Sequence, residues 1–272
     1  MSNLVGVFRE SEFSPGRVDD DAAILERTRE ALADRGLTLT LGNIDLLTGK
    51  TPAAVLAMCQ SRAALAALDR CASTTPVINA PDAIRGCYRH ETVRKLANTA
   101  VPFPLTRLVS ITHDSTQSAD VAPCWVKRGD VHAMTADDVV FAETAADVRA
   151  ALTDFSDRGI ARAALQAHVA GVVVKFYGVV DGRFFRCFTQ AAEVPAPIPR
   201  LWDAARSGAV ALGLEVFGGD LVVTDDGQPV LVDINDWPSF ARCRDEAADA
   251  IASYVVDRLI TKASPQHQGQ HG

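Results

Sequence analysis

The segment that most restricts the fold is GGDLVVTDDGQPVLVDIND, residues 218–236, in which two apolar runs flank an Asp-Gly pair. An Asp-Gly pair between such runs is among the strongest short sequence signals for a β-hairpin with a two-residue turn. If Asp226 and Gly227 form the centre of the turn, pairing outward along the strands places Asp220 opposite Asp233. The segment therefore predicts an antiparallel hairpin that carries two facing carboxylates.

Three oxygen-bearing side chains converge at the end of this hairpin. Asn235 lies two residues beyond Asp233 and so shares its face of the strand, while the same register pairs Leu221 with Val232. Like charges directly opposite on a sheet destabilise it, by about 4 kcal/mol at ~4 Å and an effective dielectric near 20. A bound divalent cation offsets that repulsion, and Mg²⁺ prefers one or two carboxylates completed by substrate phosphates. The alternative is that both Asp residues end their strands in solvent, and a one-residue bulge at the turn would reverse the faces.

Composition excludes several classes of function. The 272 residues are 48% hydrophobic and 22% charged, with a net charge of -7, which is typical of a globular protein and argues against coating nucleic acid or binding a membrane through a basic surface. The sequence has no C-x-x-C pair, no zinc-like spacing, no signal peptide and no run long enough to span a membrane. These features predict a cytoplasmic protein with free, mostly buried cysteines.

Lysine is scarce, and its positions are informative. Only five of the 27 basic residues are lysine: Lys50, Lys95, Lys127, Lys175 and Lys262. Lys127 in CWVKR and Lys175 in VVVKFYGVV lie within apolar strands, where a lysine must contact an anion or extend to water. A turn at residues 181–182 pairs Lys175 with Phe188 and Arg186 with Tyr177, which places both cations at one end of a second hairpin. Arg186 is therefore a candidate partner for a phosphate or an oxyanion.

The first part of the chain alternates between strand and helix. Apolar strands are predicted at residues 4–8, 37–47 and 76–80, with helices at 22–35 and 52–71. This order favours a small parallel α/β domain, and the first strand is not followed by the G-x-G-x-x-G fingerprint of dinucleotide-binding domains. Further helices are predicted at residues 89–100, 145–158, 201–212 and 245–259, among several antiparallel strands.

The fold class predicted from this pattern is mixed α/β with three domains. We place an N-terminal parallel α/β domain at residues 1–83, a small central domain at 84–163 and a C-terminal antiparallel-sheet domain at 164–262. The remaining residues, 263–272, are polar and rich in Gln and His, and we expect them to be disordered.

Taken in order, these motifs resemble the ATP-grasp superfamily over roughly residues 84–260. CWVK matches its lysine on a central strand, LQAHV (165–169) its adenine-holding segment, and GGD with VDIND its metal ligands. VPFPLT resembles the entry to its central domain. NDWPSF resembles the stretch after the metal ligands in RimK-type ligases and inositol polyphosphate kinases, and the order and spacing of the motifs are more specific than any one of them.

The resemblance implies ATP and Mg²⁺ (or Mn²⁺) as cofactors and assigns roles to individual residues. The metal ligands would be Asp220, Asp233 and Asn235, and the catalytic residues Lys175 and Arg186. Nucleotide would be held by Arg89, Lys127, Gln166, Ala167, His168, Val169 and Lys175. Three features depart from the family: His168 differs from the usual pattern of the adenine-holding segment, Arg89 stands where a lysine is usual, and the loop KRGDVHAMT contains a single glycine.

Three functions remain open. The first is a carboxylate-amine ligase that acts through an acylphosphate, the second a small-molecule kinase of the inositol-phosphate type, and the third a nucleotide-binding protein without catalysis. The expected substrate is a small molecule or a peptide, with no nucleic-acid or membrane partner, and a homodimer is left open. Candidate substrate contacts lie after the first strand, in the glycine-poor loop and beside the metal ligands: Arg9, Ser11, His132, Asp236 and Ser239.

Overall fold

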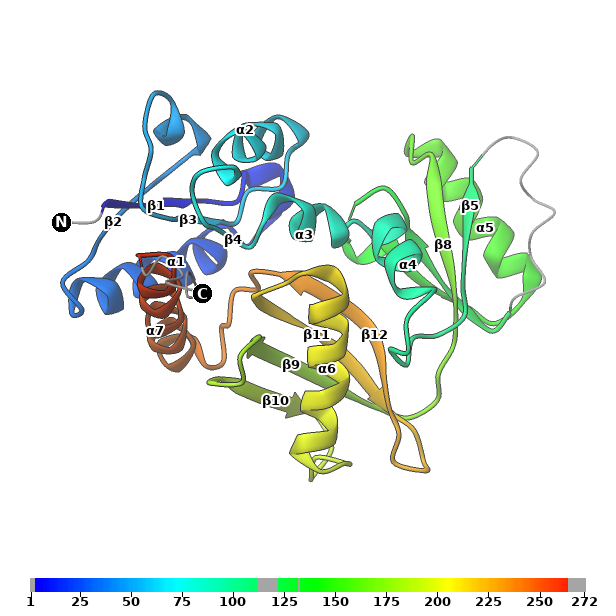
Figure 1. Cartoon of the computed structure of the whole chain (residues 1–272). Helices are drawn as coiled ribbons and strands as arrows, with labels where there is room; N and C mark the ends of the chain where they lie inside the picture. The colour runs from blue at the N-terminus through cyan, green and yellow to red at the C-terminus, as the bar shows by residue number, and fades with distance from the viewer. Residues whose placement is uncertain (1–2, 112–121, 132, 264–272) are drawn as a thin grey trace, which may run out of the picture. The chain divides into compact units, whose positions relative to one another are not determined.

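The computed structural model describes residues 3–111, 122–131 and 133–263, which contain three four-stranded sheets (Figure 1). The described residues divide into two compact units. The first unit draws on Met1–Glu10, Asp19–Ile78 and Ser239–Gly272, and the second on Ser11–Val18 and Asn79–Pro238. His132 and residues 264–272, which include most of the predicted tail, lie outside the described residues.

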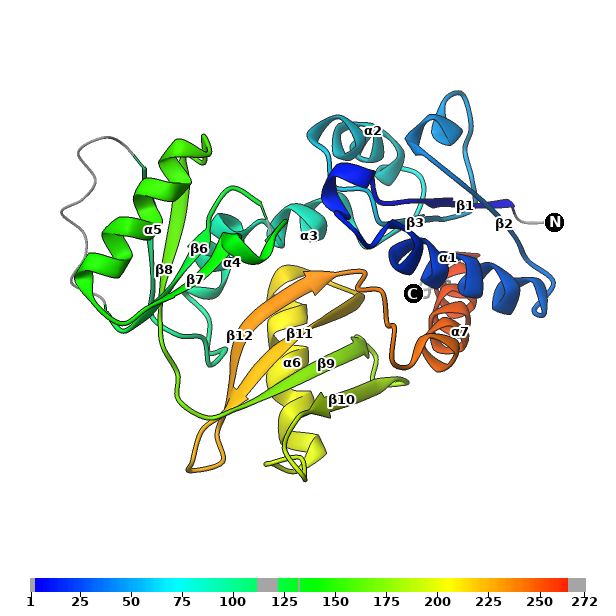
Figure 2. The same cartoon turned by 180° about the vertical axis from the view of Figure 1, so that it is seen from behind.

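The first unit contains a parallel sheet, as predicted for the start of the chain. Its strands, in the order β2-β1-β3-β4, are β1 (Asn3–Val7), β2 (Thr38–Gly42), β3 (Val55–Ala57) and β4 (Val77–Ile78). The α-helices are α1 (Val18–Ala33), α2 (Arg62–Ala72) and α7 (Arg244–Ala263), and a short 3-10 helix occupies Ile44–Leu47. A second 3-10 helix, Ser11–Phe13, follows β1 in the chain but belongs to the second unit. Figures 1 and 2 show α2 on one face of the sheet and α1 and α7 on the other.

The predicted single helix over residues 52–71 is wrong. Val55–Ala57 forms β3, between β1 and β4, and every residue of this strand is fully buried. A short apolar run buried on both faces is typical of a parallel strand and lacks the one-sided pattern of a surface helix. Helix α2 begins only at Arg62, where the Ser61 side chain accepts the N–H of Ala64 at 3.1 Å.

The second unit contains two antiparallel sheets, and the first has the order β5-β8-β6-β7. Its strands are β5 (Thr106–Ser110), β6 (Cys124–Arg128), β7 (Val139–Ala142) and β8 (Arg162–Ala167), and α5 (Ala145–Asp157) covers one face. Val126 and Leu165 pack into the core beneath α5. Because side chains alternate along a strand, Lys127 and Gln166 point to the opposite face.

The other antiparallel sheet has the order β10-β9-β11-β12. Its strands are β9 (Val172–Val179), β10 (Phe185–Thr189), β11 (Val216–Val223) and β12 (Pro229–Asp236). Helix α6 (Ile198–Leu212) lies across one face in both views, and Phe176, Leu221 and Ile234 belong to the core there (Figures 1 and 2). Helices α3 (Pro81–Gly86) and α4 (Arg89–Leu96) precede both sheets in the chain.

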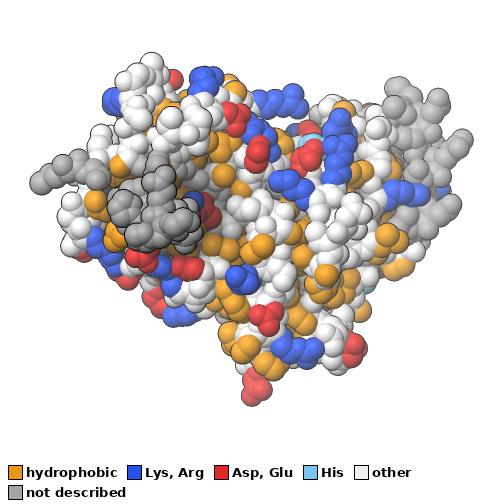
Figure 3. Space-filling model, in the orientation of Figure 1, with side chains coloured by type: hydrophobic (Ala, Val, Ile, Leu, Met, Phe, Trp, Pro, Cys, Tyr) orange, Lys and Arg blue, Asp and Glu red, His pale blue; other side chains and the backbone are white. Residues whose placement is uncertain are grey.

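The surface side chains of α3 and α4 pair by opposite charge. Arg85 lies 2.9 Å from Asp82, and Arg94 lies 2.9 Å from Glu91. Figure 3 shows basic and acidic side chains close together on this face of the second unit. These exposed pairs each contribute at most about 0.5 kcal/mol to stability, so they make the helix surfaces hydrophilic but add little to the stability of the fold.

The hairpin of β11 and β12 contains the predicted pair of Asp220 opposite Asp233. The register nearer the turn is not the predicted one, because Leu221 faces Leu231 and not Val232. A bulge after Asp220 leaves Val232 without a cross-strand partner and shifts the register back by one residue.

The turn explains the offset. The N–H of Thr224 donates to Gln228 O at 3.1 Å, and the N–H of Gly227 donates to Thr224 O at 2.8 Å. Gly227 has a φ of 76°, so the connection is a three-residue loop ending in a left-handed glycine, one of the common hairpin types. The extra loop residue and the bulge cancel, and the acidic pair is preserved.

Gly219 lies beside this bulge, and we expect Gly219→Ala to destabilise the fold by about 3 kcal/mol. A Cβ atom there would lie 2.2 Å from the backbone oxygen of Asp233 and 2.8 Å from Phe176 Cζ. Gly227→Ala is the comparison variant, because among the described residues nothing lies within 4 Å of its added Cβ. Its left-handed backbone costs only about 1 kcal/mol. Urea unfolding measures both, and equal losses would contradict the close approach at Gly219.

No helix in the described part of the chain combines the length and apolar character needed to cross a membrane. Four of the six cysteines are buried: Cys59, Cys87, Cys124 and Cys243. Burial raises the pKa of Cys187 to about 12 and also raises the pKa of Cys87. Both thiols therefore stay protonated near neutral pH and are poor nucleophiles.

Candidate nucleotide and metal site

The face of the β9–β12 sheet opposite α6 carries a row of charged side chains. Lys175 on β9 pairs with Asp220 on β11, which pairs with Asp233 on β12. The Lys175 Nζ lies 3.0 Å from Asp220 Oδ1. Asn235 shares the face, and its Nδ2 donates to Asp233 Oδ2 at 3.4 Å. Cross-strand pairing thus brings together the three side chains predicted as metal ligands.

Arg89, the first residue of α4, reaches this row from the second unit's own helices. Its Nη1 donates to Asp233 Oδ1 at 3.2 Å, and its side chain is only 9% exposed. The buried Nε donates to no acceptor among the residues that the structure describes. An unsatisfied buried donor costs about 1–3 kcal/mol. An anion that accepted a hydrogen bond from this Nε would remove that cost, so the guanidinium has the capacity to bind a further anion.

The ionisation of Asp233 follows from its neighbours. Burial by itself would raise its pKa, but the charges of Arg89 and Lys127 and the hydrogen bonds from Asn235 and Arg89 lower the pKa to about 2. Asp220 behaves differently, because burial and the charge of Asp233 raise its pKa despite the ion pair with Lys175. The two facing carboxylates are therefore electrostatically distinct, and Asp233 is ionised at neutral pH.

Lys127 approaches the acidic pair from β6. Its side chain is buried, and its Nζ donates to the backbone oxygen of Val232, the bulged residue, at 3.3 Å. Gln166 donates to the same oxygen through Nε2 at 3.3 Å. Burial, reinforced by the charge of Arg89, lowers the pKa of Lys127 to about 8. A small cavity is lined by Lys127, Gln166, Arg89 and Asp233 among others.

The donor set fits a divalent cation only when a phosphate completes it. In the described residues, no group of three or more His, Cys, Asp and Glu side chains is arranged to hold a metal ion. Asp220, Asp233 and Asn235 offer two carboxylates and one amide. Mg²⁺ bound through one or two carboxylates together with substrate phosphates requires no more than this.

The predicted adenine segment lies at the end of β8. The N–H of Ala167 donates to Leu105 O at 2.9 Å, and the N–H of His168 donates to Pro123 O at 3.2 Å. Both amides are thus engaged within the protein. Trp125 Nε1 donates to His168 Nδ1 at 3.2 Å, so the proton of the neutral imidazole sits on Nε2. Gln166 points toward Lys127 and Val232, while Val169 is half-buried.

Arg186 lies on the edge strand β10, opposite Tyr177 as predicted. It points to the same face of the sheet as Lys175, but it lies opposite Tyr177, two residues further along β9 than Lys175. Its Nη1 donates to Phe185 O at 3.0 Å, and its guanidinium lies 5.3 Å from the centre of the Phe184 ring. The side chain is exposed, so it is accessible to a substrate that approaches from the sheet edge.

Two predicted substrate residues belong to the first unit and have structural partners there. Arg9 Nη1 lies 3.0 Å from Asp21 Oδ2, with both side chains 10% exposed, and Arg9 Nε donates to Met58 O at 3.4 Å. No sequence signal links Arg9 to a partner twelve residues away. The backbone oxygen of Ser239 accepts Arg244 Nε at 3.2 Å.

The other predicted substrate residues belong to the second unit. Asp236 is 1% exposed and, by alternation along β12, points to the face opposite Asp233 and Asn235. Ser11 is exposed in the short helix Ser11–Phe13. His132 lies outside the described residues. Of the predicted cations, Arg89, Lys127 and Lys175 gather around the two carboxylates, while Arg186 lies at the sheet edge.

No protein-family model matches the sequence, and no curated protein sequence matches it either. Solved structures do match. D-cycloserine synthetase DcsG is 18% identical with a TM-score of 0.69, covering 94% of this chain and 99% of its own. An ATP-grasp RimK domain protein from Sphaerobacter thermophilus is 20% identical with a TM-score of 0.68, covering 93% and 99%. The D-alanine–D-alanine ligase from Bacillus anthracis, complexed with ATP, is 13% identical with a TM-score of 0.69, covering 96% and 97%.

These likenesses extend over almost the whole length of each chain. The protein therefore has the ATP-grasp fold, with one parallel and two antiparallel sheets. Of these three similar proteins, one is named a synthetase and one a ligase.

Proposed function

We propose that this protein is an ATP-dependent carboxylate-amine ligase that uses Mg²⁺ or Mn²⁺ and forms an acylphosphate. The observation that carries the proposal is the pair of facing carboxylates, Asp220 and Asp233, surrounded by three cations. Arg89 retains a buried Nε without an acceptor among the described residues. The ligases and synthetases among the similar structures favour this function over other uses of a nucleotide site.

In this proposal each residue has a separate task. Arg89, Lys127 and Lys175 hold the phosphates, and Asp220, Asp233 and Asn235 hold the metal ion. The metal supplies charge neutralisation at the transferring phosphoryl group. A substrate carboxylate oxygen attacks the γ-phosphorus and ADP leaves, after which an amine attacks the acyl carbon and inorganic phosphate leaves. Arg186 stabilises the oxyanion that develops on the acyl group.

The test is ADP release against a panel of carboxylate and amine pairs and of polyols. An amide product with ADP release supports the ligase. A phosphorylated product formed without an amine would select a kinase instead, and nucleotide binding without turnover would select a non-catalytic protein. Failure to bind ATP in the presence of Mg²⁺ would overturn all three.

Lys127 gives the nucleotide affinity a predicted pH dependence. The charged lysine binds phosphate, and its pKa of about 8 in the free protein means that the proton is lost as the pH rises through 8. Bound phosphate favours the charged form and raises that pKa. Affinity for ADP should therefore be constant below pH 8 and fall above it, by at most about tenfold per pH unit. Calorimetric titrations over about one and a half pH units on either side of this pKa measure the change in affinity.

Two variants isolate the contribution of Lys127. Lys127→Arg stays charged over this range and should bind ADP with little change above pH 8. Lys127→Met should bind weakly at every pH. The same decline above pH 8 in all three proteins would show that another group is responsible.

The substrate class, a small molecule or a peptide, is part of the proposal. The domain boundaries at residues 83 and 163, the cytoplasmic location and the homodimer stay predictions.

A further inference from the structure

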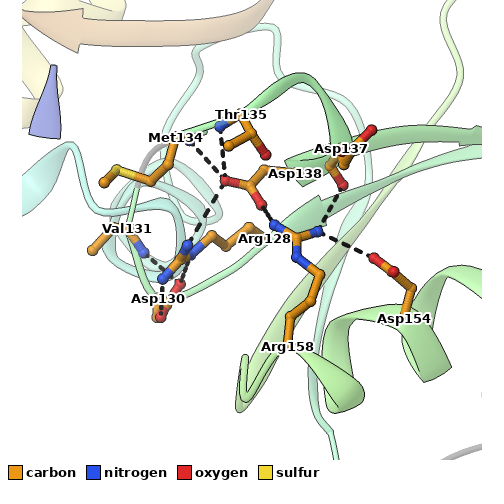
Figure 4. Close-up of polar contacts among 9 residues, drawn as sticks. All are labelled: Arg128, Asp130, Val131, Met134, Thr135, Asp137, Asp138, Asp154 and Arg158. Carbon is orange, nitrogen blue, oxygen red and sulfur yellow. Dashed lines mark hydrogen bonds and ion pairs between the residues drawn. The ribbon is translucent and has the colours of Figure 1, made fainter. Parts of the chain in front are cut away.

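A buried carboxylate joins the two ends of the segment between β6 and β7 (Figure 4). Asp138 is fully buried, and it accepts the backbone N–H groups of Met134 at 2.7 Å and Thr135 at 3.1 Å. It also forms an ion pair with Arg158, after the C-terminus of α5. Arg128, the last residue of β6, lies 3.8 Å away through Nη1. We call these five residues the Asp138 clamp.

A second carboxylate shapes the start of the same segment. Asp130 accepts Arg128 Nε at 2.6 Å and Nη2 at 3.0 Å, and it also accepts the N–H of Val131 at 3.0 Å. In glycine-rich loops such backbone N–H groups are free to face phosphate. Here the N–H groups of Val131, Met134 and Thr135 are held by the carboxylates of Asp130 and Asp138, so side chains rather than glycines fix these three residues.

The start of the segment is connected to two cations of the proposed nucleotide site, Lys127 and Arg89. Lys127 directly precedes Arg128 on β6. The backbone oxygen of Gly129 accepts the N–H of His90 at 3.1 Å and lies 3.0 Å from His90 Nδ1, and His90 follows Arg89 on α4. A shift of the segment would therefore move the backbone that carries both Lys127 and Arg89.

We propose that Asp138 is a positioning residue for the phosphate end of the nucleotide site. It fixes Arg128, Met134 and Thr135 relative to one another, and through Gly129 and His90 it fixes the cations that meet the phosphates. This inference rests on the proposed nucleotide function. Because Asp138 itself contacts no reacting atom, its loss should weaken ATP binding and leave the chemical step nearly unchanged.

Asp138→Asn is the sharpest variant, because it keeps the size of the side chain but removes the charge. Its single acceptor oxygen cannot accept both the N–H groups of Met134 and Thr135 and the guanidinium of Arg158, so the clamp loses one side. Neither guanidinium is left without a carboxylate, since Arg128 keeps Asp130 and Arg158 keeps Asp154 at 3.1 Å. The variant should therefore fold. Arg158→Met is the matched control, because it removes the contact with α5 and leaves the hydrogen bonds to Met134 and Thr135 intact.

We expect Asp138→Asn to raise the Kd and KM for ATP about tenfold or more, with kcat within about twofold of the unmodified enzyme. Arg158→Met should lower the Tm by a similar amount to Asp138→Asn and leave the ATP affinity within about twofold. Normal ATP binding by Asp138→Asn would overturn the inference. So would equal weakening in the two variants, since that would mark a general loss of stability.

Amide exchange in the unmodified protein provides a test that needs no variant. The N–H groups of Met134 and Thr135 should be protected before nucleotide is added, because Asp138 already accepts them. Rapid exchange of both amides would overturn the clamp. Failure of the unmodified protein to bind ATP would overturn the proposed function and this inference together, whereas normal binding by Asp138→Asn overturns this inference alone.

Discussion

Replacing Asp233 by Asn is expected to reduce ATP-dependent turnover by about 10³-fold or more. Asp233 faces Asp220 across the hairpin, receives Arg89 Nη1 at 3.2 Å and has a pKa lowered to about 2. Of the two proposed acidic ligands, Asp233 is therefore the one that stays ionised under all ordinary conditions. An amide at this position keeps the shape but removes the charge that would hold the metal beside the phosphates.

The measurement is the rate of ADP release with saturating ATP, metal and substrates. Asp225→Asn is the matched control, because Asp225 is an exposed turn residue of the same hairpin and should retain turnover within about twofold. Asp233→Asn also deprives the buried Arg89 guanidinium of its carboxylate, and leaving that charge unpaired destabilises the fold by about 3 kcal/mol. Unfolding must therefore be measured alongside. Normal turnover in folded Asp233→Asn would contradict the assignment of this carboxylate to the metal.

The acidic pair was predictable because two local rules converge on it. An Asp-Gly turn limits the register to a few choices, and alternation then determines which side chains face each other. The actual turn is one residue longer, and a bulge at Val232 compensates. Nothing in VLVDIND distinguishes Val232 from its neighbours, so the position of the bulge could not be predicted from the sequence. The Val232 oxygen that Lys127 and Gln166 contact was unpredictable for the same reason.

Contacts between residues far apart in the sequence were the second feature of the site that the sequence could not predict. The pairing of Arg89 with Asp233 spans 144 residues, and neither local sequence encodes it. Asp138 carried a partial signal, because Thr135 and Asp138 have the spacing of a capping box, which the structure contains. That signal predicts the local hydrogen bonds of Asp138 but not its ion pairs with Arg128 and Arg158. In the N-terminal sheet, strand β3 was missed because a three-residue buried strand has no periodicity.

Arg89→Met is expected to weaken ATP binding about 100-fold and at the same time to strengthen Mn²⁺ binding by the nucleotide-free protein about tenfold. Without nucleotide, each of the two proposed acidic ligands already has a cation: Arg89 lies 3.2 Å from Asp233, and Lys175 lies 3.0 Å from Asp220. These cations would compete with a metal ion for the carboxylates. Phosphate groups that attract Arg89 and Lys175 would free the carboxylates, which couples metal binding to nucleotide binding.

The opposite signs of the two effects make the prediction for Arg89 specific. Paramagnetic resonance measures Mn²⁺ binding without nucleotide, and calorimetry measures ATP binding with metal present. Arg89→Lys is the matched control, because it keeps the positive charge and should bind Mn²⁺ as weakly as the unmodified protein. Its single ammonium cannot reproduce the guanidinium's separate donors to Asp233 and to a phosphate, so ATP binding should be intermediate. If Arg89→Met bound Mn²⁺ no more tightly than Arg89→Lys, the guanidinium would not be the competitor of the metal at Asp233, and the coupling would have to reside in Lys175 and Asp220 alone.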